Sequence, residues 1–271
     1  MTTLNKKRQY KYGLLLSVII GIISVFLLYS INYSRIKMAL VSYEGGLQVI
    51  LVVSLRIFIL LVITFYLFNK WFKQEAQYLT DIPFLLGLFF MLLTFGKFID
   101  LFTHLIYFTL NDDLNLLVVK LRFFLIIFEV APLIYLGFEL LFFRLEDKFT
   151  KLKDKKFMDT FRTRLILLIV GVESVVIILG PTFRIVAMML PFILIPSLAG
   201  IVYIFYLAHR LNRLKVVKPK ILTIGFLLYM ISNIFRPLMQ NILGETATYV
   251  IVVEIVDICI FLVIFLGLYK K

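Results

Sequence analysis

Ionisable residues stand inside the long apolar stretches of this sequence, and their types would allow ion pairing, ligand binding or proton transfer. A charged group in the middle of a bilayer costs at least about 2.5–3.5 kcal/mol on insertion scales, so such groups usually face the inside of a helix bundle and mark function. The residues that we take as candidates for a ligand-binding site are Arg56, Lys97, Asp100, His104, Glu129, Glu173, Arg236, Glu254 and Asp257.

Their spacing places several of these residues on common helix faces. Residues three, four or seven positions apart share one face of an α-helix. The groups formed in this way are Lys97 with Asp100 and His104, Arg122 with Glu129, Asn233 with Arg236 and Gln240, and Glu254 with Asp257. We therefore expect clusters of charge inside a bundle, in which Arg236 pairs with Asp257 or Glu254 because a short connection joins their helices.

Other ionisable residues are assigned to the borders of the membrane. Lys120 and Arg122 have long side chains that can reach lipid head groups, so we interpret both as interface residues. Glu139 lies toward the more basic end of its stretch, where we expect it to pair with a lysine or an arginine.

The stretches that hold these residues have the length of membrane-spanning helices. Hydrophobic residues make up 62% of the 271 positions, against about 45–50% in a soluble domain, and a spanning helix needs roughly 20 apolar residues. The expected spans are residues 13–31, 47–68, 79–108, 114–143, 165–179, 185–208, 221–243 and 249–268. We therefore expect an all-α integral membrane protein, a single transmembrane domain over residues 1–271, built as one anchor helix plus a seven-helix bundle.

The distribution of lysine and arginine predicts the orientation. These residues fill the amino-terminal tail and every second gap, above all the loop 144–164, whereas the opposite gaps hold only Arg35, Lys37 and Arg184. Because basic residues are retained on the cytoplasmic side, we expect a multi-pass protein of the cell membrane with both termini and the basic loop 144–164 in the cytoplasm. There the bases attract anionic lipid head groups, and no separate basic domain points to nucleic acid.

Several kinds of chemistry find no support in the sequence. No glycine-rich nucleotide loop occurs, and we expect no cofactor. With two histidines and a single cysteine, Cys259, a multi-histidine zinc site and an intrachain disulfide are excluded. No serine stands beside a histidine that could activate it, so no catalytic residue is assigned.

The depth of the charges suggests where they meet. At 1.5 Å per residue, most candidates lie in the outer half of the membrane, with Glu129 and Glu173 near its middle. Two interpretations are open: a closed network of ion pairs that fixes helix pairing, or a polar pocket that opens outward. For the pocket we expect a lining of aromatic residues with Asp100, His104, Arg236 and Glu254.

Three stretches carry a resemblance to a known family. They are residues 89–107, residues 123–143 followed by Arg144, and the basic connector 210–220 followed by residues 221–235. Together they resemble the seven-helix membrane sensor regions found ahead of histidine kinases and cyclic-dinucleotide enzymes in prokaryotic signalling proteins. The resemblance implies detection of a small molecule, a lipid or a membrane state. Because the sequence given ends without an output domain, it also implies a separate cytoplasmic signalling partner.

The leading functional hypothesis is a receptor- or sensor-like membrane protein that binds a small polar or amphiphilic ligand in a pocket on the extracytoplasmic side. A proton- or ion-coupled transporter is the first alternative, with Glu129 and Glu173 as carriers. The second alternative is a membrane enzyme acting on lipid head groups, so enzymatic activity stays open. Its acid–base groups would be Asp100, His104, Glu254 and Asp257.

Overall fold

The computed structural model describes residues 3–106, 112–146, 149, 154–212, 214, 216–244 and 246–269, and over these residues the chain is all-helical, without a β-strand. The helices are α1 (Thr3–Ile31), α2 (Tyr33–Ser42), α3 (Gly46–Phe72), α4 (Ile82–Ile106), α5 (Asp112–Leu145), α6 (Lys155–Leu179), α7 (Phe183–Arg210), α8 (Pro219–Leu243) and α9 (Ala247–Leu268). The predicted fold class, all-α, is confirmed for the described part of the chain.

Four of these helices are long and apolar enough to cross a membrane by length and composition. They are Gln9–Ile31 within α1, and α3, α4 and α9. Helices of this kind are typical of multi-pass membrane proteins. Two loops on which the expected topology depends are only partly described: residues 107–111, and residues 147–148 and 150–153 of the basic loop, lie outside the described residues.

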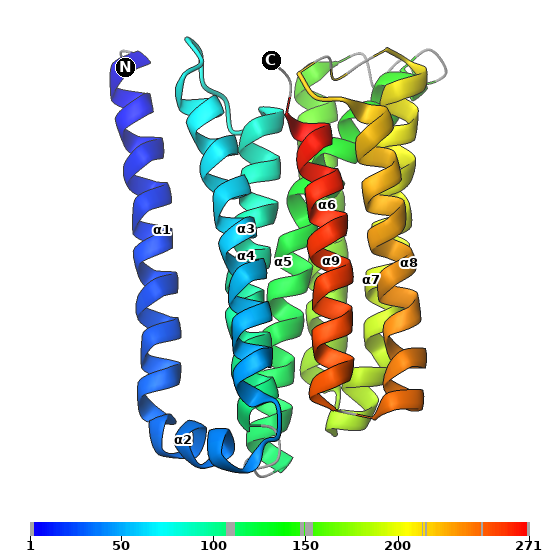
Figure 1. Ribbon diagram of the computed structural model, residues 1–271. Coiled ribbons are helices and arrows are strands. Elements are labelled where there is room, and N and C mark those ends of the chain that lie inside the picture. The colour runs from blue at the N-terminus through cyan, green and yellow to red at the C-terminus, as the bar shows by residue number, and fades with distance from the viewer. Residues whose placement is uncertain are drawn as a thin grey trace.

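The long helices stand side by side, and neighbours in sequence from α3 to α9 run in opposite directions (Figure 1). Contacts join α3 to α4, α4 to α5, α7 to α8 and α8 to α9, and α9 packs back onto α3. Helix α5 also packs on α7, which leaves α6 on the outside of the bundle against α5. The start of α1 and the end of α9 lie at the same end of the bundle (Figure 1).

Helix α1 stands apart from the other long helices (Figure 1). Near its start, Tyr10 packs against Trp71 of α3, with 6.1 Å between ring centres. Near its end, the Tyr29 hydroxyl donates a hydrogen bond of 2.8 Å to the Phe98 carbonyl oxygen of α4. An apolar cleft of about 840 Å³ lies between α1, α3 and α4.

A short helix that the sequence analysis did not predict connects α1 to α3. Helix α2 lies across the end of the bundle (Figure 1). Ile36, Ala39 and Leu40 fall on one helix face and pack toward buried residues of α3 and α4, whereas Lys37 is exposed. Met38 and Val41 are exposed beside Lys37, so the outer face of α2 carries both apolar and polar side chains. At its end, Gly45 takes a φ of +83°, which turns the chain into α3.

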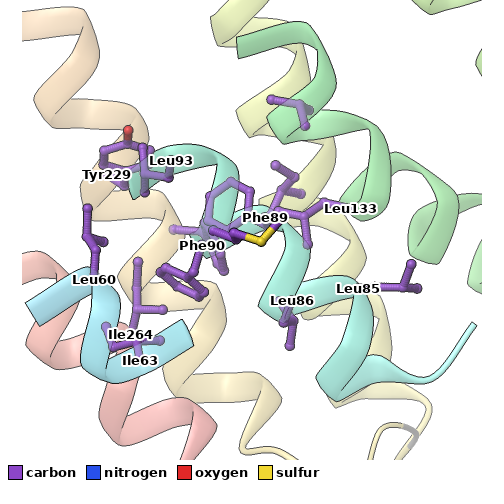
Figure 2. Packing of buried hydrophobic residues seen from close by; sticks show 14 of the residues in the cluster. Leu60, Ile63, Leu85, Leu86, Phe89, Phe90, Leu93, Leu133, Tyr229 and Ile264 are labelled. Carbon is purple, nitrogen blue, oxygen red and sulfur yellow. The ribbon is translucent and has the colours of Figure 1, made fainter. Parts of the chain in front are cut away.

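The main apolar core lies toward the end of the bundle that holds the α1 start. Phe90 of α4 contacts Phe261 of α9 with 6.0 Å between ring centres. Phe226 of α8 stacks on Phe205 of α7 at 5.3 Å and contacts Phe89 of α4 at 5.8 Å. Leucine and isoleucine side chains of α3, α4, α5 and α9 fill the space around these rings (Figure 2). This layer holds together the helices that carry the charged residues.

Candidate functional site

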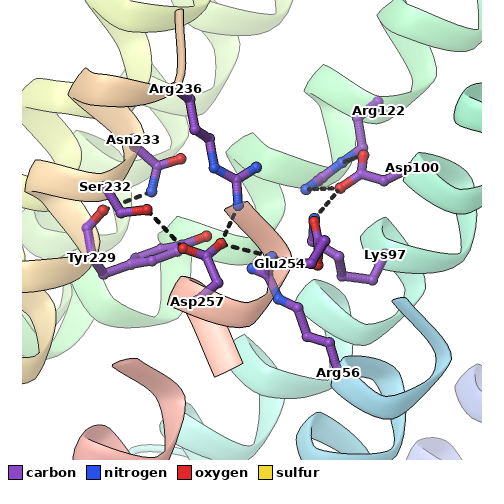
Figure 3. A network of polar contacts seen from close by, with 10 residues as sticks. All are labelled: Arg56, Lys97, Asp100, Arg122, Tyr229, Ser232, Asn233, Arg236, Glu254 and Asp257. Atoms are coloured by element: carbon purple, nitrogen blue, oxygen red, sulfur yellow. Dashed lines mark hydrogen bonds and ion pairs between the residues drawn. The ribbon is translucent and has the colours of Figure 1, made fainter. Parts of the chain in front are cut away.

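Eight charged side chains meet between α3, α4, α5, α8 and α9. Figure 3 shows all of them except Glu129. They lie away from the end that holds the α1 start, in the half nearer the α8–α9 connection. Bases and acids alternate along a continuous row of contacts, here called the ion-pair row. In order, its members are Glu129, Arg122, Asp100, Lys97, Glu254, Arg56, Asp257 and Arg236.

The first half of the row joins α5 to α4 and then to α9. Arg122 Nε lies 2.6 Å from Asp100 Oδ1. The other oxygen of this carboxylate, Oδ2, lies 2.9 Å from Lys97 Nζ. Lys97 Nζ in turn lies 3.0 Å from Glu254 Oε1 on α9. At the Glu129 end of the row, Glu129 Oε2 is 3.7 Å from Arg122 Nη1, a distance too long for a hydrogen bond.

The second half joins α9 to α3 and α8. Arg56 Nη1 lies 2.8 Å from Glu254 Oε2 and 2.6 Å from Asp257 Oδ2. Asp257 also pairs with Arg236 and accepts a hydrogen bond of 2.7 Å from the Ser232 hydroxyl. The side chains of Arg56 and Asp257 are fully buried, and the Arg56 guanidinium lies 5.0 Å from the centre of the Phe261 ring. Such stacking provides part of the stabilisation that water would otherwise give.

Some buried polar atoms of the row have no hydrogen-bond partner in the described part of the chain. These atoms are Arg56 Nε and Nη2, Arg122 Nη1, Glu129 Oε2 and Arg236 Nε. Buried polar groups in proteins are paired in the great majority of cases, so each exception calls for an explanation. Three of these residues, Arg122, Glu129 and Arg236, line the same cavity.

The cavity has a volume of about 280 Å³ and lies between α4, α5, α7, α8 and α9. The Asp100 and Arg236 side chains are 20% and 24% exposed, so the cavity is not sealed. Its lining residues are Lys97, Asp100, His104, Arg122, Phe123, Ile126, Glu129, Leu194, Ile195, Tyr229, Asn233, Arg236 and Tyr249.

Two expectations about pairing are confirmed. Arg236 forms an ion pair with Asp257, one of its two expected partners. Glu139 pairs with Arg162 of α6, with 3.3 Å between Oε2 and Nη1. The Arg162 guanidinium also lies over the Tyr135 ring, at 3.8 Å from its centre.

The lining of the cavity agrees in part with the expected pocket. Asp100, His104 and Arg236 line it, and its aromatic wall is made by Phe123, Tyr229 and Tyr249. Glu254 is not among the lining residues. Because both of its oxygens are held by Lys97 and Arg56, its carboxylate lies behind the cavity and connects the two halves of the row.

Glu173 lies outside the ion-pair row, contrary to the expectation that it belongs to the same site. It lines a different cavity, of about 390 Å³, together with Gly137 of α5 and Ser197 and Gly200 of α7. The reason is the position of α6, which packs on the outer side of α5, whereas the row lies between α3, α4, α5, α8 and α9. The expected depth of Glu173 in the membrane therefore did not identify the residues around it.

The interpretation of Arg122 as a plain interface residue is wrong. Its guanidinium turns inward to Asp100, and the backbone at Gly96 makes room for it. A Cβ atom at position 96 would lie 2.8 Å from Arg122 Cζ. Lys120 Nζ is exposed and donates to the Ile178 carbonyl oxygen of α6 at 2.9 Å.

The sequence analysis placed Asn233 on the same helix face as Arg236, but it did not assign Ser232 of α8 or Tyr249 of α9 to the site. Ser232 stands one turn before Arg236, and this i,i+4 spacing could have revealed that both reach Asp257. Asn233 lines the cavity while its amide donates to the Tyr229 carbonyl oxygen at 2.8 Å. The Tyr249 hydroxyl donates to the Arg236 carbonyl oxygen at 3.2 Å and holds α8 beside α9.

The arrangement suits binding better than acid–base catalysis. Every acid of the row lies within ion-pairing distance of at least one base. Over the described residues, no group of three or more histidine, cysteine, aspartate or glutamate side chains could hold a metal ion. Comparison of the chain with protein families, with curated proteins and with solved structures finds no match.

Proposed function

We propose that this protein is a membrane receptor or sensor that binds a small polar ligand in the cavity beside the ion-pair row. The observation that carries the proposal is the set of buried polar atoms without partners on Glu129, Arg122 and Arg236, all three of which line the cavity. A network that served only to pair helices would satisfy such atoms within the protein. A binding site leaves them for the ligand.

The proposed topology has eight membrane-spanning helices, with both termini in the cytoplasm. The eight long helices support it, because α1 begins and α9 ends at the same end of the bundle (Figure 1). The concentration of lysine and arginine in loop 144–164 supports the orientation. In this topology the cavity lies in the extracytoplasmic half of the bundle, and the basic loop contacts anionic head groups.

The proposed signal runs from the cavity to the cytoplasmic face. The ion-pair row contacts five helices, so a ligand that displaces one of its ends changes contacts on several helices together. The resemblance to seven-helix sensor regions supports the same direction, because helices α3 to α9 provide seven helices beside α1. The receiver of the signal is a separate protein at the basic cytoplasmic face.

The alternatives have less support. A carrier that uses Glu129 and Glu173 would need both on one path, yet the two residues line different cavities. A lipid enzyme would need a free acid or base, whereas Asp100 and Glu254 each hold two bases. Ligand-dependent flux in liposomes would favour the transporter, and turnover of lipid in detergent would favour the enzyme.

Accessibility of the cavity tests the proposal. In a Cys259→Ser background, Asn233→Cys should react with a membrane-impermeant thiol reagent added outside intact cells, because Asn233 lines the cavity. Glu44→Cys, exposed between α2 and α3, is the positive control, and Ala208→Cys, fully buried at the other end of α7, is the negative control. Absence of reaction at position 233, while position 44 reacts, would overturn the proposal.

A further inference from the structure

We infer that the cavity binds a zwitterion, with a cationic ammonium group against Glu129 and an anionic carboxylate or phosphate group against Arg236. The inference rests on the proposed function and names the class of ligand for the same cavity. A free amino acid, a betaine and the head group of a zwitterionic phospholipid share this chemistry.

The first support is the position of the two ends of the row. Each inner member contacts two opposite charges, as Asp100 does with Arg122 and Lys97. Among the described residues, Glu129 has one ion-pair partner, Arg122 at 3.7 Å, and Arg236 has one, Asp257. The row therefore ends in one acid and one base, each with a single partner, and both ends line one cavity.

The second support is the set of atoms that remain available. Both oxygens of Asp100 and both oxygens of Glu254 lie within ion-pairing distance of bases. At Glu129, which is only 3% exposed, Oε2 has no hydrogen-bond partner. At Arg236, Nε has none. Arg122 Nη1, the third such atom on a lining residue, lies beside Glu129 Oε2 at 3.7 Å. Arg236 Nε is therefore the buried donor at the other end of the row from the Glu129 acceptor.

The third support is the balance of charge. The row contains the bases Arg56, Lys97, Arg122 and Arg236 and an equal number of acids, so it is neutral as a whole. A ligand with a net charge would leave one charge uncompensated in a largely buried site, which is costly. A zwitterion adds one charge of each sign and gives each end of the row its second partner.

The shape of the cavity fits such a ligand. Its volume of about 280 Å³ is close to the lower limit of ligand pockets, about 300 Å³, and suits a small molecule or a single head group. Phe123, Tyr229 and Tyr249 form part of its wall. Aromatic faces attract ammonium groups, including quaternary ones. Ile126 and Leu194 offer an apolar surface for the remaining carbon atoms.

Thermal unfolding of the purified full-length protein in detergent tests the inference. The probes are the common L-amino acids and glycine betaine, each beside the matched acid without the amino group and the matched amine without the carboxylate. Glycerophosphoethanolamine and glycerophosphocholine represent lipid head groups. We expect at least one zwitterion to raise the Tm in a saturable way, and its singly charged analogues to bind at least tenfold more weakly.

Variants identify the two ends. Glu129→Gln should weaken binding of the zwitterion at least tenfold and leave binding of the matched acid unchanged. Arg236→Gln should also weaken binding of the zwitterion at least tenfold, but leave binding of the matched amine unchanged. Glu173→Gln, in the other cavity, is the matched control and should bind as the parent protein does. Arg236→Gln also removes one of the ion-pair partners of Asp257. If Arg236→Gln does not fold, Glu129→Gln alone decides the assignment.

A second arm separates the two sources of the zwitterion. If a lipid is the ligand, nanodiscs of phosphatidylethanolamine or phosphatidylcholine should raise the Tm relative to phosphatidylglycerol, and Glu129→Gln should abolish the difference. A soluble zwitterion should act equally in each kind of lipid.

The outcomes distinguish this inference from the proposed function. Equal binding of a zwitterion and its singly charged analogue would overturn the inference but still support a ligand-binding cavity. No effect of any probe or lipid would also overturn the inference. The proposed function is then decided by the reaction of Asn233→Cys, which does not depend on the choice of ligand.

Discussion

Arg56 of α3 and Asp257 of α9 lie 2.6 Å apart, and both side chains are fully buried. Asp257 also holds Arg236 and Ser232 of α8. One carboxylate therefore connects three helices at the point where α9 packs back onto α3. Loss of this single charge should affect the whole bundle more than loss of any exposed charge.

Replacement of this carboxylate is the strongest test of the row as a structural element. Asp257→Asn keeps the shape but leaves Arg56 and Arg236 with less compensation, and breaking a buried pair typically costs about 3–5 kcal/mol. We expect a loss of this size in the free energy of unfolding, measured by denaturant titration in mixed micelles. Lys37→Ala, at an exposed position of α2, should change it by less than about 0.5 kcal/mol. Equal losses of unfolding free energy in Asp257→Asn and Lys37→Ala would contradict a structural role for the Asp257 carboxylate.

Replacement of Glu254 on α9 and replacement of Glu173 on α6 should change the free energy of unfolding by different amounts. Glu254→Gln removes the charge between Lys97 and Arg56 and should destabilise the protein by about 3 kcal/mol or more. Glu173 lies outside the row, so Glu173→Gln should leave the free energy of unfolding within about 1 kcal/mol of the parent value. The same unfolding titration measures both, and a larger loss for Glu173→Gln would place it in the network after all.

Room for Arg122 depends on the absence of a side chain at position 96. Gly96→Ala would bring Cβ to 2.8 Å from Arg122 Cζ and push the guanidinium away from Asp100. Overpacking of this kind costs about 1–3 kcal/mol, and we expect a Tm lowered accordingly. Gly171→Ala is the matched control, because nothing lies within 4 Å of its new Cβ. Alanine is the better helix former, by about 1 kcal/mol, so the control should be neutral or stabilising.

The orientation can be measured with exposed cysteines. In the Cys259→Ser background, Glu44→Cys should react with an impermeant thiol reagent outside intact cells, whereas Lys156→Cys should react only after permeabilisation. The expectation follows from the retention of basic residues in the cytoplasm. The reverse pattern would invert the topology and place the cavity in the cytoplasmic half.

The sequence was enough to predict the long helices, because runs of apolar residues have few other structures available. It also predicted the pair of Arg236 with Asp257, since a short connection forces α8 and α9 to be neighbours. It did not predict that Arg122 turns inward, because that depends on Gly96 of another helix. Nor did it place Glu173, whose helix packs outside α5, although its depth resembles that of Glu129.

The order of synthesis determines when the ion pairs of the row can form. Both carboxylates that pair with Arg56 lie on α9, and the first of them, Glu254, follows Arg56 by 198 residues. At about 5–20 residues per second, synthesis of that interval takes roughly 10–40 s. During this time Arg56 has neither of these partners, and Arg236 of α8 has not yet met Asp257. A nascent chain that stops before α9 therefore holds two guanidinium groups without the carboxylates that pair with them in the complete fold.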